Sequence, residues 1–211
     1  MESNVMEMMN LSGKTAIITG GAGLLGEKHA EAIAEAGGIP VILDINEEKI
    51  SEVTRSIRDK YNINCQGFNC DITNIEDLQK CKSIVLSKFG CIDILINNAA
   101  LDPKVTKDQS GKSLNRLEDF DIKQWNLELA VGLTGAFLCT QVFGAEMAKN
   151  NSGVIINVSS DLGIIAPDQR LYRQDNTPEL EQSVKPVTYS VIKHGLIGLT
   201  KYITTYWAKD G

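Results

Sequence analysis

The chain has 211 residues, of which 43% are hydrophobic and 23% charged, and its formal net charge is −6. This length accommodates one well-buried domain. The acidic balance argues against a nucleic-acid partner, because a protein that binds the phosphate backbone needs a basic face. No stretch has the roughly 18 uninterrupted apolar residues of a membrane span, so we expect no membrane partner either.

The N-terminal segment 1–11 and the cysteines bear on the cellular compartment. The segment begins MESNVMEMMN and lacks the cationic start and apolar core of a signal peptide, so we expect a short extension that precedes the fold. The cysteines are five, an odd number, and form no CxxC pair. This pattern predicts reduced thiols and no metal site. Both features are typical of a cytoplasmic protein.

The rest of the chain alternates apolar runs of strand length with amphipathic helical patterns. Strands are expected at 14–19, 40–44, 64–71, 92–99 and 153–160, and helices at 24–37, 46–60, 74–89, 121–149 and 187–207. Repeated strand–helix–strand units imply a parallel sheet covered by helices on both faces. Right-handed crossovers then favour a doubly wound, three-layer α/β/α fold of Rossmann type with strand order 3-2-1-4-5. We expect one such domain over residues 1–211.

Two long irregular segments, 100–120 and 161–186, each follow the carboxyl end of a strand. Ligands bind at that edge of doubly wound sheets, and loops of this length are often functional. The sequence therefore predicts a binding site at this edge.

The turn after the first strand reads TGGAGLLGE and places Gly20, Gly23 and Gly26 three residues apart. Glycine permits the tight turn and lets the backbone approach a pyrophosphate. The helix that begins near Leu24 and Leu25 then offers N–H groups and a partial positive charge to that anion. The alternative is a glycine-rich connector with no ligand. The order of strand, turn and helix favours a dinucleotide site.

Two acidic residues end the next two strands. Asp44 lies 24 residues after Gly20, where a carboxylate can accept hydrogen bonds from the adenosine ribose and would repel a 2′-phosphate, which favours NAD over NADP. The nearest cation, Lys28, lies on the helix rather than in the turn. Asp71 and the adjacent Ile72 reach the same sheet edge, where an adenine amino group could be recognised. The alternative for Asp71 is the N-cap of the following helix.

Tyr189 and Lys193 are four residues apart in VTYSVIKHG. On a helix this spacing puts both side chains on one face. A nearby cation favours the phenolate form of a tyrosine and lowers its pKa. Such a tyrosine can protonate a carbonyl oxygen, or deprotonate an alcohol, while hydride moves to or from a nicotinamide.

These motifs, in this order, resemble the short-chain dehydrogenase/reductase family. The resemblance covers nearly the whole chain and is carried by TGGAGLLG, Asp44, CDIT, NNAA at 97–100, IINVSS at 155–160, and Tyr189 with Lys193. It implies that Ser160, rather than Ser159, orients the reacting oxygen. It also implies that Lys193 binds the nicotinamide ribose and that Asn98 and Ala99 line the cofactor. For Asn97, a hydrogen bond that braces the sheet and a ligand contact remain open.

The sequence departs from the family pattern at several points. Leu24 stands where the shorter members have glycine, and this phase is more typical of sugar-nucleotide epimerases and dehydratases. Gly132 replaces an asparagine that holds a water of the proton relay, and it marks a candidate kink in the helix. The segment 161–186 is longer than in ordinary members and carries Arg170, Tyr172 and Arg173. The family also continues beyond AKDG into further strands, so we expect those C-terminal elements to be absent from the given chain.

The insert leads to the hypothesis that its arginines help to recognise a polar, anionic, sugar-like substrate; the alternative is a solvated excursion. Together the features predict an NAD(H)-dependent oxidoreductase that interconverts a secondary alcohol and a ketone. A sugar-nucleotide epimerase or dehydratase with tightly held NAD, and a non-catalytic dinucleotide-binding sensor, are the alternatives. The helices at 121–149 and 187–207 are apolar almost all round, which predicts a homodimer or homotetramer through these helices.

Overall fold

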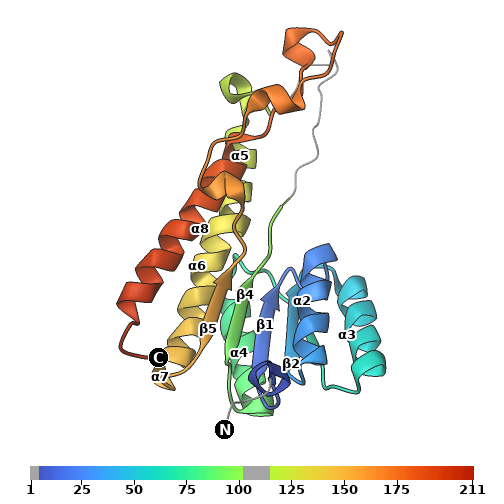
Figure 1. The fold of residues 1–211 in the computed structure, drawn as a ribbon, viewed down its shortest axis with the longest axis vertical. Coiled ribbons are helices and arrows are strands. Elements are labelled where there is room, and N and C mark those ends of the chain that lie inside the picture. The colour runs from blue at the N-terminus through green and yellow to red at the C-terminus, as the bar shows by residue number, and fades with distance from the viewer. Residues whose placement is uncertain (1–4, 102–114) are drawn as a thin grey trace.

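A five-stranded parallel sheet forms the centre of the computed structural model, which describes residues 5–101 and 115–211. Its strand order is β3-β2-β1-β4-β5, as the sequence predicts. The strands are β1 (Thr15–Thr19), β2 (Ile39–Asp44), β3 (Gln66–Asn69), β4 (Ile94–Asn97) and β5 (Val154–Asn157). Because all strands are parallel, their carboxyl ends meet at one edge, which lies at the top of the sheet in Figure 1.

Helices cover both faces of this sheet. They are α1 (Val5–Met8), α2 (Leu24–Glu35), α3 (Glu47–Tyr61), α4 (Ile75–Phe89), α5 (Ile122–Leu129), α6 (Gly135–Cys139), α7 (Ala145–Lys149) and α8 (Val187–Tyr206). The helices α2 and α3 bury Ile33, Val53 and Ile57 against one face. On the other face, α4 buries Leu78 together with Phe143, which belongs to the long helical run Ile122–Lys149. The three-layer α/β/α architecture is therefore confirmed (Figure 1).

Local sequence explains where the helices of the first half begin. The side chain of Asn46 accepts a hydrogen bond from the N–H of Lys49 and caps α3. The side chain of Asn74 accepts from the N–H groups of Glu76 and Asp77 and caps α4. Asn74 is thus the cap, and Asp71 does not take that role.

The helix expected at 121–149 is one continuous run that begins at Ile122, but it is not a regular α-helix. Two π-helical segments, Ala130–Thr134 and Thr140–Gly144, interrupt it. Gly132 lies in the first of them, consistent with the irregularity expected there. Over its 28 residues the run is long and apolar enough to cross a membrane, but half of its most apolar window is buried inside the protein, as in a core helix.

The two long loops expected at 100–120 and 161–186 contain short 3-10 turns in the parts that the structure describes. Leu117–Asp119 forms a 3-10 turn before α5, whereas most of the predicted loop 100–120 lies outside the described residues. The insert 161–186 contains the 3-10 turns Asp161–Gly163, Gln169–Tyr172 and Glu179–Glu181. It extends beyond the sheet and runs above the amino end of α8 (Figure 1).

The predicted N-terminal extension is partly joined to the fold. The N–H of Leu11 donates a hydrogen bond of 2.8 Å to the carbonyl of Ala36, and its side chain packs against the core between the sheet and α2. The chain is therefore anchored to the domain just before β1 begins.

Candidate active site

Glycines bring the backbone close to its neighbours in the turn that follows β1. Gly20 has a φ of +59°, and a Cβ added there would lie 2.9 Å from the Cα of Ala99. A Cβ added to Gly26 would strike the carbonyl oxygen of Gly20. Glycine is therefore required at both positions, for the backbone conformation at Gly20 and for close packing of α2 on the turn at Gly26.

The amino end of α2 is open to a ligand. Its N-cap is Gly23, which offers no side-chain hydrogen bond to the first turn. Leu24 and Leu25, the first residues of the helix, are 82% and 58% exposed. A first turn carries N–H groups without helical acceptors and a partial positive charge. This end of α2, reached through a glycine turn, fits the pyrophosphate of a dinucleotide.

Asp44 ends β2 beside the glycine turn. One carboxylate oxygen accepts a hydrogen bond of 3.1 Å from the N–H of Ala22, and the other accepts one of 3.1 Å from the N–H of Asn46. A carboxylate has about four acceptor sites, so acceptor capacity is left for ribose hydroxyls. Lys28 does not compete for this carboxylate, because its ammonium pairs with Glu31 at 2.7 Å.

The residues after β4 brace the same turn. The side-chain amide of Asn98 donates to the carbonyls of Thr19 and Gly20 at 3.0 and 3.2 Å, and the N–H groups of Asn98 and Ala99 both donate to the Thr19 hydroxyl at 3.0 Å. These contacts fix the wall in front of the glycine turn. Asn97 braces the sheet instead, because its amide donates to the Asn157 side chain at 2.8 Å.

Asp71 and Ile72 follow β3 at the same edge. The carboxylate of Asp71 accepts hydrogen bonds from the N–H and the hydroxyl of Thr73, at 2.9 and 2.7 Å, and so closes a turn before α4. It does not cap that helix. The side chain of Ile72 is buried in the core, where a Cβ added to Gly135 would lie 2.6 Å from it. A contact of either residue with adenine stays a prediction.

Tyr189 and Lys193 lie near the amino end of α8, with the Lys193 Nζ 5.6 Å from the centre of the Tyr189 ring. Lys193 is buried, and its Nζ donates a hydrogen bond of 2.6 Å to the carbonyl of Val158 after β5. Burial lowers the pKa of Lys193, and the positive charge of Lys185 lowers it further. A cation is thus anchored beside the tyrosine, in the arrangement that the spacing predicts.

The two serines after β5 face different partners. The hydroxyl of Ser159 donates to the carbonyl of Lys193 at 2.9 Å and ties the strand end to α8. The hydroxyl of Ser160 donates to Asp161 at 2.7 Å and accepts from the N–H of Leu162. Ser159 therefore ties the strand end to α8, and Ser160 starts the turn leading into the insert.

The arginines of the insert form ion pairs within it. Arg170 binds Asp168 with its Nη2 2.7 Å from a carboxylate oxygen, and Arg173 pairs with Glu179. Both arginine side chains are at least half exposed. Their role in binding an anionic substrate stays a prediction. To bind such a substrate, each arginine would have to leave its carboxylate partner or contact the carboxylate and the substrate together.

Two charged residues near the pair were missed by the sequence analysis. The Nζ of Lys185 lies 3.9 Å from the centre of the Tyr189 ring, closer than that of Lys193. Glu128 of α5 is buried and accepts a hydrogen bond from Thr188, the residue before Tyr189. Of the two, only Glu128 could have been noticed in the sequence, because it is a lone acidic residue in an apolar helical stretch, one turn before Gly132.

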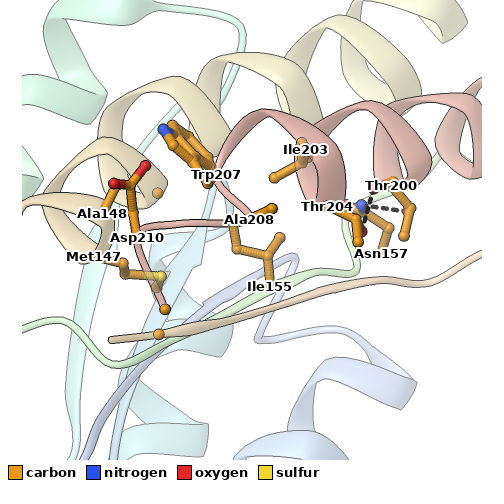
Figure 2. A pocket seen from close by; sticks show the side chains of 13 residues that line it. Met147, Ala148, Ile155, Asn157, Thr200, Ile203, Thr204, Trp207, Ala208 and Asp210 are labelled. Atoms are coloured by element: carbon orange, nitrogen blue, oxygen red, sulfur yellow. Dashed lines mark hydrogen bonds between the residues drawn. The ribbon is translucent and has the colours of Figure 1, made fainter. Parts of the chain in front are cut away.

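A wide cavity lies away from these residues. It has a volume of about 440 Å³ and opens beside β5, the edge strand of the described sheet. Figure 2 shows Met147, Ile155, Ile203 and Trp207 around it, with the amide of Asn157 bonded to Thr200. It contains none of the predicted catalytic or cofactor residues. Size alone therefore does not locate the active site.

Comparison with known proteins places this arrangement in a family. Residues 14–172 match the model described as short chain dehydrogenase. The chain belongs to the short-chain dehydrogenase family. It is 34% identical over 213 residues to the short chain dehydrogenase/reductase dpfgG of Gibberella zeae, which covers 97% of this chain and 68% of that protein. It is also 28% identical to the D-threitol dehydrogenase of Mycolicibacterium smegmatis, over 95% of this chain and 67% of the relative.

A solved member of the short-chain dehydrogenase family has the same fold. NAD⁺-bound xylitol dehydrogenase superposes with a TM-score of 0.78 at 25% identity, covering 95% of this chain and 67% of the other. This chain thus spans about two thirds of the length of these relatives. The named relatives are dehydrogenases or reductases, and the chain is an oxidoreductase of this family.

Proposed function

We propose that this chain interconverts a secondary alcohol and a ketone with NAD(H), and that Tyr189 is the acid–base group. The observation that carries the proposal is the buried ammonium of Lys193, held by the Val158 carbonyl beside the Tyr189 ring. A tyrosine hydroxyl beside a fixed lysine is suited to exchange a proton with a substrate oxygen.

The chain's own residues divide the work as follows. The nicotinamide cofactor, when bound, supplies or accepts the hydride. Tyr189 gives a proton to the carbonyl oxygen during reduction and takes it from the hydroxyl during oxidation. Ser160, at the carboxyl edge of the sheet, orients that oxygen with its hydroxyl. Lys193, anchored beside the tyrosine, would bind the ribose hydroxyls next to the nicotinamide.

The cofactor preference rests on the glycine turn and Asp44. The open amino end of α2 would hold the pyrophosphate, and the Asp44 carboxylate, which has acceptor capacity left beside the turn, would bind the adenosine ribose. The same negative charge would repel the 2′-phosphate of NADP. We therefore expect NAD(H) to bind more tightly than NADP(H).

The substrate class is supported by the relatives together with the charges around Tyr189. One relative is a threitol dehydrogenase and a solved neighbour is a xylitol dehydrogenase, both named for polyols. The insert also brings the ammonium of Lys185 to 3.9 Å from the centre of the Tyr189 ring. Because a charged side chain lies beside the tyrosine, a polar, carbohydrate-like alcohol or ketone would bind there better than an apolar one.

A subunit interface through the long helical run and α8 completes the proposal. Apolar side chains remain exposed on both, including Leu127, Phe137 and Val191. A helix that covers one sheet needs a single apolar stripe, so the second apolar surface is best explained by a partner subunit. We propose a homodimer or homotetramer built through these two helices.

The test combines cofactor binding with turnover. NADH and NADPH are titrated by fluorescence, and the enzyme is then assayed with a panel of polyols and keto-sugars. We expect tighter binding of NADH and stoichiometric consumption of NADH with a ketone. Conversion of a sugar nucleotide without net change in NADH would instead indicate an epimerase or dehydratase, and binding without any turnover would indicate a sensor.

Tyr189→Phe tests the assignment of the acid–base group. It should lower kcat by at least about a hundredfold, because the proton donor is lost, while NADH affinity stays within a few-fold. Tyr202→Phe is the matched control, since Tyr202 is exposed further along α8, and it should retain full activity. Substantial activity in Tyr189→Phe would remove this residue from the proposed role.

A further inference from the structure

The insert 161–186 carries two arginines and one lysine, and the lysine differs from the arginines in its surroundings. Both arginines form ion pairs with acidic residues of the insert. Lys185 pairs with no carboxylate in the part of the chain that the structure describes, and its ammonium lies over the Tyr189 ring instead. Lys185 is therefore the cation of the insert whose charge is available to a ligand.

The backbone of Lys185 is held in place at the start of α8. The side chain of Gln169 accepts a hydrogen bond of 2.9 Å from the Lys185 N–H and donates one of 3.3 Å to the Lys185 carbonyl. The next residue, Pro186, is buried and forms the N-cap of α8. A proline restricts its own backbone and that of the residue before it. The lysine side chain therefore starts from a fixed point close to Tyr189.

Two like charges meet around the Tyr189 ring. The Nζ atoms of Lys185 and Lys193 lie 3.9 and 5.6 Å from its centre. Burial lowers the pKa of Lys193, and the positive charge of Lys185 adds to this effect, so the two ammonium groups repel each other. An anion bound at Lys185 would offset this repulsion, whereas a neutral ligand would not.

A cavity of about 380 Å³ opens beside Lys185, between the insert and the segment 115–118. Its volume is in the range of small-molecule sites. The helix α8 contributes Val187 and Ser190 to its lining, one residue from each side of the Thr188–Tyr189 pair in the sequence. Lys185 thus borders both the Tyr189 ring and a space in which the rest of a substrate could lie.

The lining of this cavity suits a carbon chain with hydroxyl groups and one negative charge. The carboxylate in the lining belongs to Glu118, which pairs with Arg116 at 3.5 Å, so these two charges compensate each other and the charge of Lys185 is left over. The hydroxyl oxygen of Ser190 is buried and has no hydrogen-bond partner within the described ranges, so it can bond a ligand hydroxyl. Leucine, valine and proline side chains supply apolar walls.

We propose that Lys185 is a specificity-determining residue: it binds a carboxylate or phosphate group of a polyol or keto-sugar whose carbon chain runs from Tyr189 into this cavity. The charge of the substrate is then recognised by Lys185 rather than by the two arginines of the insert. The consequence for turnover rests on the proposed function, whereas the contact between Lys185 and the anion can be measured by binding alone.

Binding is measured by calorimetry, with and without NADH, using gluconate, sorbitol 6-phosphate and neutral sorbitol as probes. The wild type should bind at least one anionic probe more tightly than sorbitol. Lys185→Gln should weaken binding of that anion at least about tenfold, because a charge-assisted contact is lost, and change sorbitol binding less than about twofold. A loss for gluconate identifies a carboxylate ligand, and a loss for sorbitol 6-phosphate identifies a phosphate ligand.

Lys201→Gln is the matched control for this titration, because Lys201 is an exposed lysine further along α8. It should leave the affinity for all three probes unchanged. Wild-type enzyme that does not prefer either anion to sorbitol, or an equal loss in Lys185→Gln and Lys201→Gln, would overturn the proposal.

A crystal structure and a turnover assay complete the test. In a co-crystal of the wild type, the charged group of the preferred probe should lie within about 4 Å of the Lys185 Nζ. An anion bound elsewhere would overturn the proposal even if Lys185→Gln failed to fold. In turnover, Lys185→Gln should lower kcat/KM for an anionic substrate about tenfold, mainly through KM, whereas Arg170→Gln and Arg173→Gln should keep the wild-type value. Lys185-dependent anion binding combined with an active Tyr189→Phe enzyme would reject the proposed function and leave the contact standing.

Discussion

At the scale of single residues, the glycine turn is the part of the site with the least tolerance for change. The backbone of Gly20 occupies the space that a Cβ on Gly26 would need, and neither the turn nor α2 can move without the other. Clashes with backbone are costlier than clashes with the flexible end of a side chain, because the whole segment has to shift. The position of α2 over the turn therefore depends on the absence of one methyl group.

Gly26→Ala should weaken NADH binding by more than tenfold and lower the free energy of unfolding by about 2 kcal/mol. The measurements are a fluorescence titration and urea denaturation. Ala32→Gly is the matched control, because Ala32 is exposed on the same helix; it should cost about 1 kcal/mol of stability through helix propensity and leave NADH affinity unchanged. Equal NADH affinity in Gly26→Ala and the wild type would contradict the proposed pyrophosphate site.

At the scale of elements, an ion pair ties the start of β1 to β4. The carboxylate of Asp93 binds the Lys14 ammonium at 2.9 Å and the N–H of Thr15 at 2.9 Å. Burial works to raise the pKa of Asp93, but the hydrogen bonds from Lys14 and Thr15 outweigh it, and the pKa lies below its ordinary value. The contact thus stabilises the charged form of the carboxylate and, with it, the pairing of the two central strands.

The sign of this shift predicts a pH dependence. Stability from Asp93 is fully present above the ordinary aspartate pKa and is lost as pH falls through the lower pKa of the folded state. Asp93→Asn should therefore lower the free energy of unfolding by about 1–2 kcal/mol at pH 7, with a difference from wild type that shrinks below about pH 4. Urea denaturation from pH 3 to pH 7 measures this, with Asp59→Asn, an exposed position on α3, as the control. A difference that stays constant with pH would contradict the assignment.

Which elements could be predicted depended on whether local sequence determines them. The strand order and the caps Asn46 and Asn74 follow from periodicity and from side chains that bond their own helix start. The π-helical segments could be predicted only in part: Gly132 marked an irregularity in the first of them, but no local pattern specified a π-helix or the close approach of Ile192 to Gly132. Packing between distant segments is absent from any local pattern.

The candidate site divides in the same way. The spacing of Tyr189 and Lys193 puts them on one helix face wherever that helix packs, so their proximity could be predicted. Lys185 reaches the Tyr189 ring only because of the path that the insert takes before α8, and no motif encodes that path. Glu128 meets Thr188 through the packing of α5 on α8. Contacts between elements therefore had to come from the structure.

At the scale of the whole molecule, the exposed apolar side chains of the long helical run and α8 predict an assembly. Phe137 is 47% exposed, and Leu127 and Val191 also reach the surface of these helices. If two copies pair through these helices, a charge at the centre of the interface would be buried without a partner, which costs several kcal/mol. A glutamate that replaces an exposed apolar residue elsewhere on the surface would stay hydrated.

Phe137→Glu should therefore convert the oligomer into monomers at micromolar concentration, as measured by sedimentation velocity. Ile84→Glu is the matched control, because Ile84 is 40% exposed on α4, outside the two helices, and it should leave the assembly intact. NADH binding to the Phe137→Glu monomer should persist, because the glycine turn and Asp44 come from elements of one chain. An unchanged oligomer in Phe137→Glu, or equal dissociation in both variants, would mean that subunits associate through a different surface.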